Sequence, residues 1–137
     1  MKIFEINREN LRKAWNGADQ YWFSLRDYAV KDSSVLVNFD IPEGVSQTAY
    51  FVSLGYIPYF TVSDEEVIRA YVFTLNNEKL KTALSKISSE EYVETFWKYF
   101  NAYPKRIAEG WDEFENNYVI NKAVEWCREN AINYIIK

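Results

Sequence analysis

The fold of this chain is decided at residues 63–75, which read SDEEVIRAYVFTL. Ser63 and Glu66 have the spacing of a capping box, in which the serine oxygen accepts a hydrogen bond from the Glu66 backbone N–H and the glutamate reaches back. Apolar residues then recur at helical spacing, at Val67, Ile68, Tyr71, Val72 and Leu75. We therefore predict that a helical half of the chain begins at residue 63.

Four more helices are predicted after this one. Asn77 is expected to cap the second, and residues 88–91 repeat the capping signal for the third. Pro104 suits the first position of a fourth helix, which carries Trp111, Phe114 and Tyr118. The last helix carries the apolar residues of 120–127 and is expected to stop at Asn130.

Residues 1–62 are predicted to be mainly extended, apart from a short helix capped by Asn7. Ring-rich and apolar segments bounded by polar residues indicate strands at 21–25, 28–30 and 35–39. Pro58 lacks a backbone N–H, so the strand at 56–60 is confined to a sheet edge. Residues 46–54 are ambiguous between helix and strand.

The predicted fold class is α+β: a small N-terminal antiparallel sheet with one helix, followed by a packed helical C-terminal half. Residues 132–136 are β-prone and are expected to return to the N-terminal sheet as a final strand. The sequence contains no internal repeat, low-complexity tract or linker. We therefore predict a single domain over residues 1–137, with an extended part at 1–62 and a helical part at 63–131.

The composition excludes several kinds of chemistry. The 137 residues include 5 Trp, 11 Tyr and 9 Phe, but one cysteine and no histidine. The absence of histidine excludes Ser-His-Asp and Cys-His catalysis and any His-ligated metal site. One thiol forms neither an internal disulfide nor a zinc site, and it fits a reducing compartment. We expect no catalytic residue, no metal and no cofactor.

The charge and hydropathy of the chain limit its partners. Sixteen basic and twenty acidic residues give a net charge of −4, and an acidic chain repels the phosphate backbone. Nucleic acid is therefore a disfavoured partner. No segment approaches the length of a membrane span, and charges at Lys2 and Glu5 interrupt any signal-peptide core. We expect a soluble cytoplasmic protein.

Cys127 is the one strong nucleophile in the chain. Its predicted place near a helix C-terminus opposes a thiolate, because the helix dipole is negative there. It also lies three and four residues from Val124 and Ala123, on the apolar stripe. We interpret Cys127 as a buried structural thiol.

The charged clusters of the sequence are interpreted as solvated surface. Paired carboxylates can perform acid–base catalysis or bind Mg²⁺, but Asp112 and Glu115 flank an apolar seam on an otherwise polar helix. The densest acidic cluster is Glu109, Asp112, Glu113 and Glu115. The basic residues interpreted as ordinary surface are Lys79, Lys81, Lys86, Lys98, Lys105 and Arg106.

The surplus of tyrosine is the main candidate for function, because tyrosine combines a large contact area with a polar tip. The candidate binding residues, all on predicted strands or loops, are Tyr21, Trp22, Tyr56, Tyr59 and Tyr103. We predict a non-catalytic interaction or regulatory protein whose aromatic, acidic surface binds a protein partner or a second copy. Two alternatives stay open: a small-ligand binding module with an aromatic-lined pocket, and a carboxylate-dependent enzyme using Asp112 or Glu115.

The sequence over roughly residues 56–132 resembles a family of small bacterial proteins classed as uncharacterised. The likeness lies in Ile57-Pro58, in residues 92–96 and 111–114, and in a Glu-Trp…Glu-Asn motif within 123–132. Residues 31–55 depart from the family pattern and are interpreted as an insertion. The resemblance implies an α+β fold and carries over no activity.

Overall fold

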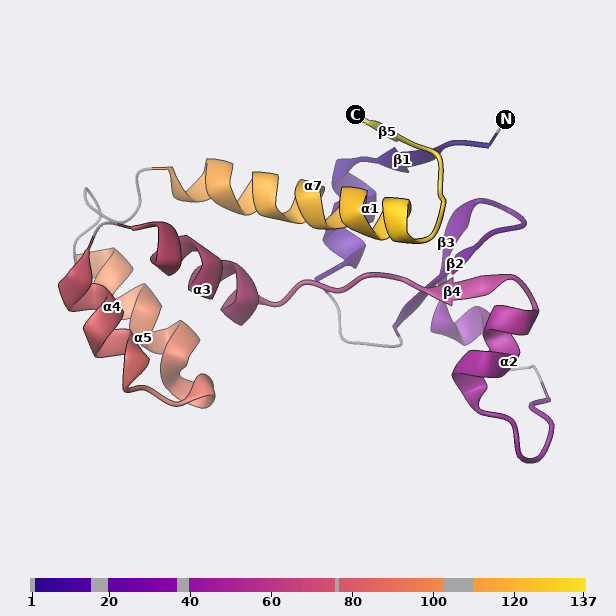
Figure 1. Cartoon of the computed structure of the whole chain (residues 1–137), viewed down its shortest axis with the longest axis horizontal. Coiled ribbons are helices and arrows are strands. Elements are labelled where there is room, and N and C mark those ends of the chain that lie inside the picture. Colours follow the sequence, from indigo (N-terminus) through magenta and orange to yellow (C-terminus); the bar gives the residue numbers. More distant parts are fainter. Residues whose placement is uncertain (1, 16–19, 37–39, 76, 103–109) are drawn as a thin grey trace. The chain divides into compact units, whose positions relative to one another are not determined.

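The structure is a computed structural model that describes residues 2–15, 20–36, 40–75, 77–102 and 110–137 (Figure 1). The chain divides into two compact units: unit 1 is 1–61 with 120–137, and unit 2 is 62–119. Unit 1 contains the strands and unit 2 is helical in its described residues, which confirms the α+β class. One domain over the whole chain stays a prediction.

Unit 1 contains two small sheets. In the first, β2 (Tyr21–Ser24) lies between β3 (Ala29–Asp32) and β4 (Tyr56–Pro58), and both pairings are antiparallel. The predicted antiparallel sheet is thus confirmed, with Pro58 on an edge strand as expected. In the second sheet, β1 (Phe4–Ile6) pairs in parallel with β5 (Tyr134–Ile136).

The second sheet corrects one expectation. The predicted final strand exists, but it pairs with β1 in a sheet of its own instead of joining the antiparallel sheet. The β1 strand was missed because three residues, only two of them apolar, are too short to establish a two-residue period.

The helices of unit 1 begin at side-chain caps. Asn7 Oδ1 accepts from the Asn10 backbone N–H at 2.9 Å, as predicted, and starts α1 (Arg8–Lys13). Ser46 caps α2 (Gln47–Ser53), so the ambiguous stretch at 46–54 is helical.

The strand predicted at 35–39 is wrong where the structure describes it. Residues Ser33–Leu36 form the 3₁₀ helix η1, and residues 37–39 lie outside the described part of the chain. Asp32 Oδ1 accepts from the Ser34 backbone N–H at 2.9 Å. This local turn bends the chain directly after β3 and competes with an extended conformation.

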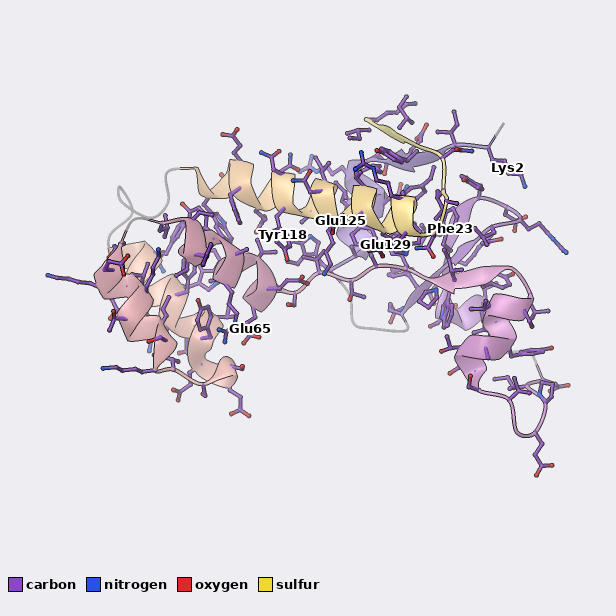
Figure 2. All side chains as sticks on the ribbon, in the orientation of Figure 1. Lys2, Phe23, Glu65, Tyr118, Glu125 and Glu129 are labelled. Atoms are coloured by element: carbon purple, nitrogen blue, oxygen red, sulfur yellow. The ribbon has the colours of Figure 1, made fainter. Side chains whose placement is uncertain are left out.

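Unit 2 is built on α3 (Asp64–Thr74), α4 (Glu78–Ser85), α5 (Ser89–Ala102) and the first part of α7 (Trp111–Glu129). The predicted capping box is confirmed, because Ser63 N–H donates to Glu66 Oε1 at 2.7 Å and Glu66 N–H donates to Ser63 Oγ at 3.2 Å. The hydroxyl of Tyr118, labelled in Figure 2, donates to Glu66 Oε2 at 3.0 Å and connects α7 to this cap.

Two helices were predicted where the structure has the single helix α7. No glycine, proline or N-cap geometry separates Tyr118 from Ile120, so the helix continues through them. The predicted stop is close to the observed end at Glu129. There the Ile132 N–H donates to the Cys127 carbonyl at 2.8 Å and the Ala131 N–H donates to the Arg128 carbonyl at 3.4 Å. These two bonds form a Schellman motif.

This motif places Ala131 at a φ of +55°, a conformation that favours glycine. Ala131→Gly relieves the strain of a positive φ but also increases the conformational entropy of the unfolded chain. We expect the balance of these two effects to raise the free energy of unfolding by up to about 1 kcal/mol. Urea unfolding measures the change. The matched variant Ala123→Gly, inside α7, should lose about 1 kcal/mol or more. Equal effects of the two changes would contradict the assignment.

Candidate functional site

The first aromatic cluster of unit 1 surrounds Trp126. The ring centroids of Phe23 (Figure 2), Tyr59 and Phe4 lie 5.3, 5.1 and 5.8 Å from that of Trp126. The indole Nε1 donates to the Pro58 carbonyl at 3.1 Å, so the one polar atom of the ring has a partner. These edge-on ring contacts are typical of an aromatic core.

The second cluster lies on the other face of β2, because neighbouring residues of a strand point to opposite faces. Trp22 is 2% exposed, and its ring centroid lies 5.0 Å from that of Phe51 on α2. Leu36 completes the buried cluster, and the partly buried Tyr50 and Tyr56 pack against it. The sheet is therefore covered by rings on both faces.

These two clusters contain three of the predicted binding residues. Trp22 and Tyr56 come together in the second cluster, whereas Tyr59 is only 6% exposed in the first and donates its hydroxyl to the Asn10 carbonyl at 2.7 Å. Burial, followed by the charge of Cys127, raises the pKa of Tyr59. Tyr21 is half-buried, with the Lys13 ammonium 6.0 Å from its ring.

Tyr103 lies outside the described residues. Burial gives Trp22 and Tyr59 a packing role and leaves neither ring exposed to a partner. A binding role for the five predicted residues stays a prediction, as does an aromatic-lined ligand pocket.

Cys127 is completely buried in α7, as predicted from its spacing. Burial raises the pKa of its thiol to about 11. At neutral pH about one thiol in ten thousand would carry the charge that a nucleophile needs. The position is therefore unsuited to thiol catalysis.

We expect the thiol of the native protein to react with an aromatic disulfide reagent at pH 7 at least about 100-fold more slowly than the same thiol in denaturant, where its pKa returns to about 8.5. Absorbance of the released thiolate measures both rates. A native rate within tenfold of the denatured rate would contradict the buried position.

The net charge is concentrated in unit 2. Unit 1 contains nine basic and nine acidic residues, whereas unit 2 contains seven basic and eleven acidic residues. Unit 2 therefore carries the whole net charge of −4. A count over the two units finds this difference in the sequence, but only after the boundaries at residues 62 and 119 are known.

Two carboxylates of unit 2, Asp64 and Asp112, act electrostatically on a third, Glu115, and we call the three the carboxylate cluster. The pKa of Glu115 is raised, first by partial burial and then by the negative charges of Asp64 and Asp112. Among the described residues, no lysine or arginine forms an ion pair with any of the three. The cluster thus holds like charges together without a compensating cation in that part of the chain.

Helix stability explains only part of this arrangement. Asp64 and Asp112 lie in the first turns of α3 and α7, where the helix dipole favours negative charge. Glu115 lies beyond the first turn of α7, so its negative charge gains little from the helix dipole. Helix stability therefore does not explain the position of Glu115. The other member of the predicted acidic group on this helix, Glu113, is exposed, and Glu109 lies outside the described residues.

The lysines of unit 2 are surface residues. Lys81 and Lys98 lie 3.8 and 3.7 Å from Glu78 and Glu94 on their own helices, while Lys79 and Lys86 are exposed. Such exposed pairs contribute little to stability. Lys105 and Arg106 lie outside the described residues.

One exposed ring was missed by the sequence analysis. Phe73 on α3 is 82% exposed, and the Lys81 ammonium lies 5.9 Å from its ring. The helical spacing in the sequence could have indicated this exposure. Phe73 does not lie on the helix face formed by Val72 and the other apolar residues of α3.

No group of three or more cysteines, aspartates or glutamates in the described residues is arranged to hold a metal ion. None of the helices that the structure describes combines the length and the hydropathy needed to span a bilayer. Comparison with protein-family models, curated proteins and solved structures finds no match to this chain. Function is therefore inferred from the chain's own residues.

Proposed function

We propose that this chain is a non-catalytic interaction protein that binds a basic protein partner through the acidic surface of unit 2, centred on the carboxylate cluster. The observation that carries this proposal is the concentration of negative charge in unit 2, where eleven acidic residues face seven basic ones and no described lysine or arginine pairs with Asp64, Asp112 or Glu115. The raised pKa of Glu115, caused first by partial burial and then by the charges of Asp64 and Asp112, agrees with this placement.

A basic partner would relieve the repulsion within the cluster. Like charges at helical spacing, such as Asp112 and Glu115, destabilise a helix by about 0.2–0.5 kcal/mol. A lysine or arginine of the partner would convert this repulsion into charge-assisted hydrogen bonds, which are stronger than neutral ones. The uncompensated charge of unit 2 would also accelerate association with a basic partner.

Other features agree with this proposal. The lone buried thiol of Cys127 supports a location in a reducing cytoplasm. The likeness to a bacterial family stays a proposal about the fold, and it supplies no activity. A small-ligand binding module and, less favoured, acid–base catalysis by Asp112 or Glu115 stay the alternatives.

The proposal is tested by affinity capture of basic proteins from a cell extract, using three forms of the full chain. The first is wild type and the second neutralises the cluster by Asp64→Asn, Asp112→Asn and Glu115→Gln together. The third makes the same change of net charge on α5, by Glu90→Gln, Glu91→Gln and Glu94→Gln.

We expect a basic partner to be retained by the wild type and the α5 variant, to be lost by the cluster variant, and to elute as salt rises toward 0.5 M because screening shortens the range of the attraction. No retained basic protein, or equal loss in both variants, would overturn the proposal.

The cluster also makes a prediction about stability. We expect Glu115→Gln to raise the free energy of unfolding by about 0.2–0.5 kcal/mol at pH 7, since it removes a repelled charge. The raised pKa means that the folded wild type binds the Glu115 proton more tightly than the unfolded chain, so the stability contribution of Glu115 falls as pH rises through the folded pKa. The gain from the substitution should therefore vanish below about pH 4, near the ordinary pKa of glutamate. Urea unfolding between about pH 3 and 8 measures the gain, with Glu94→Gln as the control that shows no gain.

A further inference from the structure

Unit 1 contains a cleft of about 340 Å³ between two strands that do not pair with each other. One wall is β1, at Ile3, Phe4 and Glu5, and the opposite wall is the start of β3, at residues 28–30. Asn10 and Lys13 of α1 complete the lining. Both walls are edge strands of their sheets, so each turns one row of backbone groups away from its own partner.

The β3 wall presents free backbone groups. The Ser33 N–H donates to the Gln20 carbonyl at 2.9 Å. Because every second residue of β3 bonds to β2, this contact shows which residues of β3 turn their backbone groups toward β2 and which turn them outward. Ala29 and Lys31 then face β2, and the N–H and carbonyl of Val30 point outward. No partner for these two groups is recorded among the described residues.

The β1 wall is partly satisfied. The Phe4 N–H donates to the Asn133 carbonyl at 2.7 Å and the Lys137 N–H donates to the Ile6 carbonyl at 3.0 Å, so Phe4 and Ile6 face β5 and Glu5 faces the other way. The Glu5 carbonyl accepts from Asn10 Nδ2 at 2.8 Å. The Glu5 N–H has no recorded partner in the described part of the chain.

We infer that this cleft binds an extended peptide segment of a partner protein, which adds a strand to the outer edge of β3 beside Val30. A strand residue occupies roughly 160 Å³, from a rise of about 3.3 Å, a strand spacing of about 4.8 Å and a sheet thickness of about 10 Å. The cleft therefore holds about two residues of such a strand, which would pair with the part of the four-residue β3 around Val30. Backbone hydrogen bonds give such a peptide its affinity, and the alternate side chains that face the cleft give specificity.

This peptide site goes beyond the proposed function. The salt dependence of the binding affinity distinguishes binding at the cleft from binding at the carboxylate cluster. Unit 1 contains equal numbers of basic and acidic residues, and the two charged side chains that line the cleft, Glu5 and Lys13, have opposite signs, so binding there rests mainly on backbone hydrogen bonds. Affinity at the cleft should change less than about twofold between 50 and 300 mM salt, whereas binding at the carboxylate cluster should weaken strongly.

The test begins with selection of a displayed library of random octapeptides on the full chain, followed by titration of the enriched peptides. Val30→Pro removes the outward N–H without removing a ladder bond, as edge strands tolerate. Val30→Trp keeps the outward N–H but fills the cleft, because Val30 lies opposite Phe23 on the sheet face that Phe4 of β1 contacts, so the test remains valid if one variant fails to fold. Ile136→Pro is the matched control, because the Ile136 N–H also points outward, but from the edge of β5.

We expect enriched peptides to bind at least tenfold more weakly to Val30→Pro and Val30→Trp, and to bind Ile136→Pro with unchanged affinity. Amide hydrogen exchange at Val30 should slow when peptide is bound. Failure to enrich any peptide, equal binding by the two cleft variants and the wild type, or equal loss in Ile136→Pro would overturn the inference.

Discussion

Trp126→Ala is expected to lower the free energy of unfolding by about 3–5 kcal/mol, the usual cost of removing a large buried aromatic side chain. Trp126 is 7% exposed and has four ring neighbours with centroids at 5.1–5.8 Å: Phe4, Phe23, Tyr59 and Phe60. The substitution leaves a cavity among these rings and removes the donor to the Pro58 carbonyl. Urea unfolding followed by circular dichroism measures the loss.

Phe73→Ala is the control for this experiment. It also removes a ring, but the Phe73 side chain is 82% exposed, so the expected change lies within about 0.5 kcal/mol. Comparable losses from the two substitutions would show that the rings around Trp126 are not the core of unit 1.

The second large effect is expected in unit 2, where Phe96→Ala should also cost about 3–5 kcal/mol. Phe96 is completely buried, and the ring centroids of Trp97 and Trp111 lie 5.2 and 5.6 Å from its own. Urea unfolding measures this loss. Amide hydrogen exchange is measured as well, because Trp126→Ala and Phe96→Ala together also test the prediction of a single domain.

If residues 1–137 form one cooperative domain, Trp126→Ala and Phe96→Ala each lower the protection of slowly exchanging amides in both units. We expect this result, because α7 contributes residues to each unit and its loss would remove core residues from both. Loss of protection confined to the unit that carries the substitution would contradict the single domain.

The sequence predicted the helical half well because its signals are local. The capping box at Ser63 and the cap at Asn77 require only a few neighbouring residues, and the structure confirms both. The end of α7 near Asn130 was predicted for the same reason. The break expected before Ile120 was wrong because a change in the phase of apolar residues does not end a helix when no residue there interrupts its hydrogen bonds.

The N-terminal half was harder because its structure depends on distant partners. β1 forms against β5, whose residues lie at the other end of the chain, and no local period reveals that pairing. The part of the strand expected at 35–39 that the structure describes, residues 35–36, is wrong because the Asp32 side chain turns the backbone at Ser34, an interaction that a count of apolar residues ignores.

Only the general character of the candidate site was predicted from the sequence. An acidic surface was expected from the composition, but the pKa of Glu115 is raised first by partial burial and then by the charges of Asp64, on a different helix, and Asp112, and a sequence pattern shows neither the burial nor the contact with Asp64. The tyrosine surplus is partly explained by packing: the structure places Tyr59 in the core, whereas hydropathy alone ranks its hydroxyl-bearing ring as a surface group.

The pairing of β1 with β5 also has a consequence during synthesis. Phe4 lies opposite Tyr134, so a ribosome must add 130 further residues before the partner of the first strand exists. At about 5–20 residues per second this takes roughly 7–26 s. During that interval β1 has no strand to join, and on crowded polysomes it is free to pair with a neighbouring nascent chain.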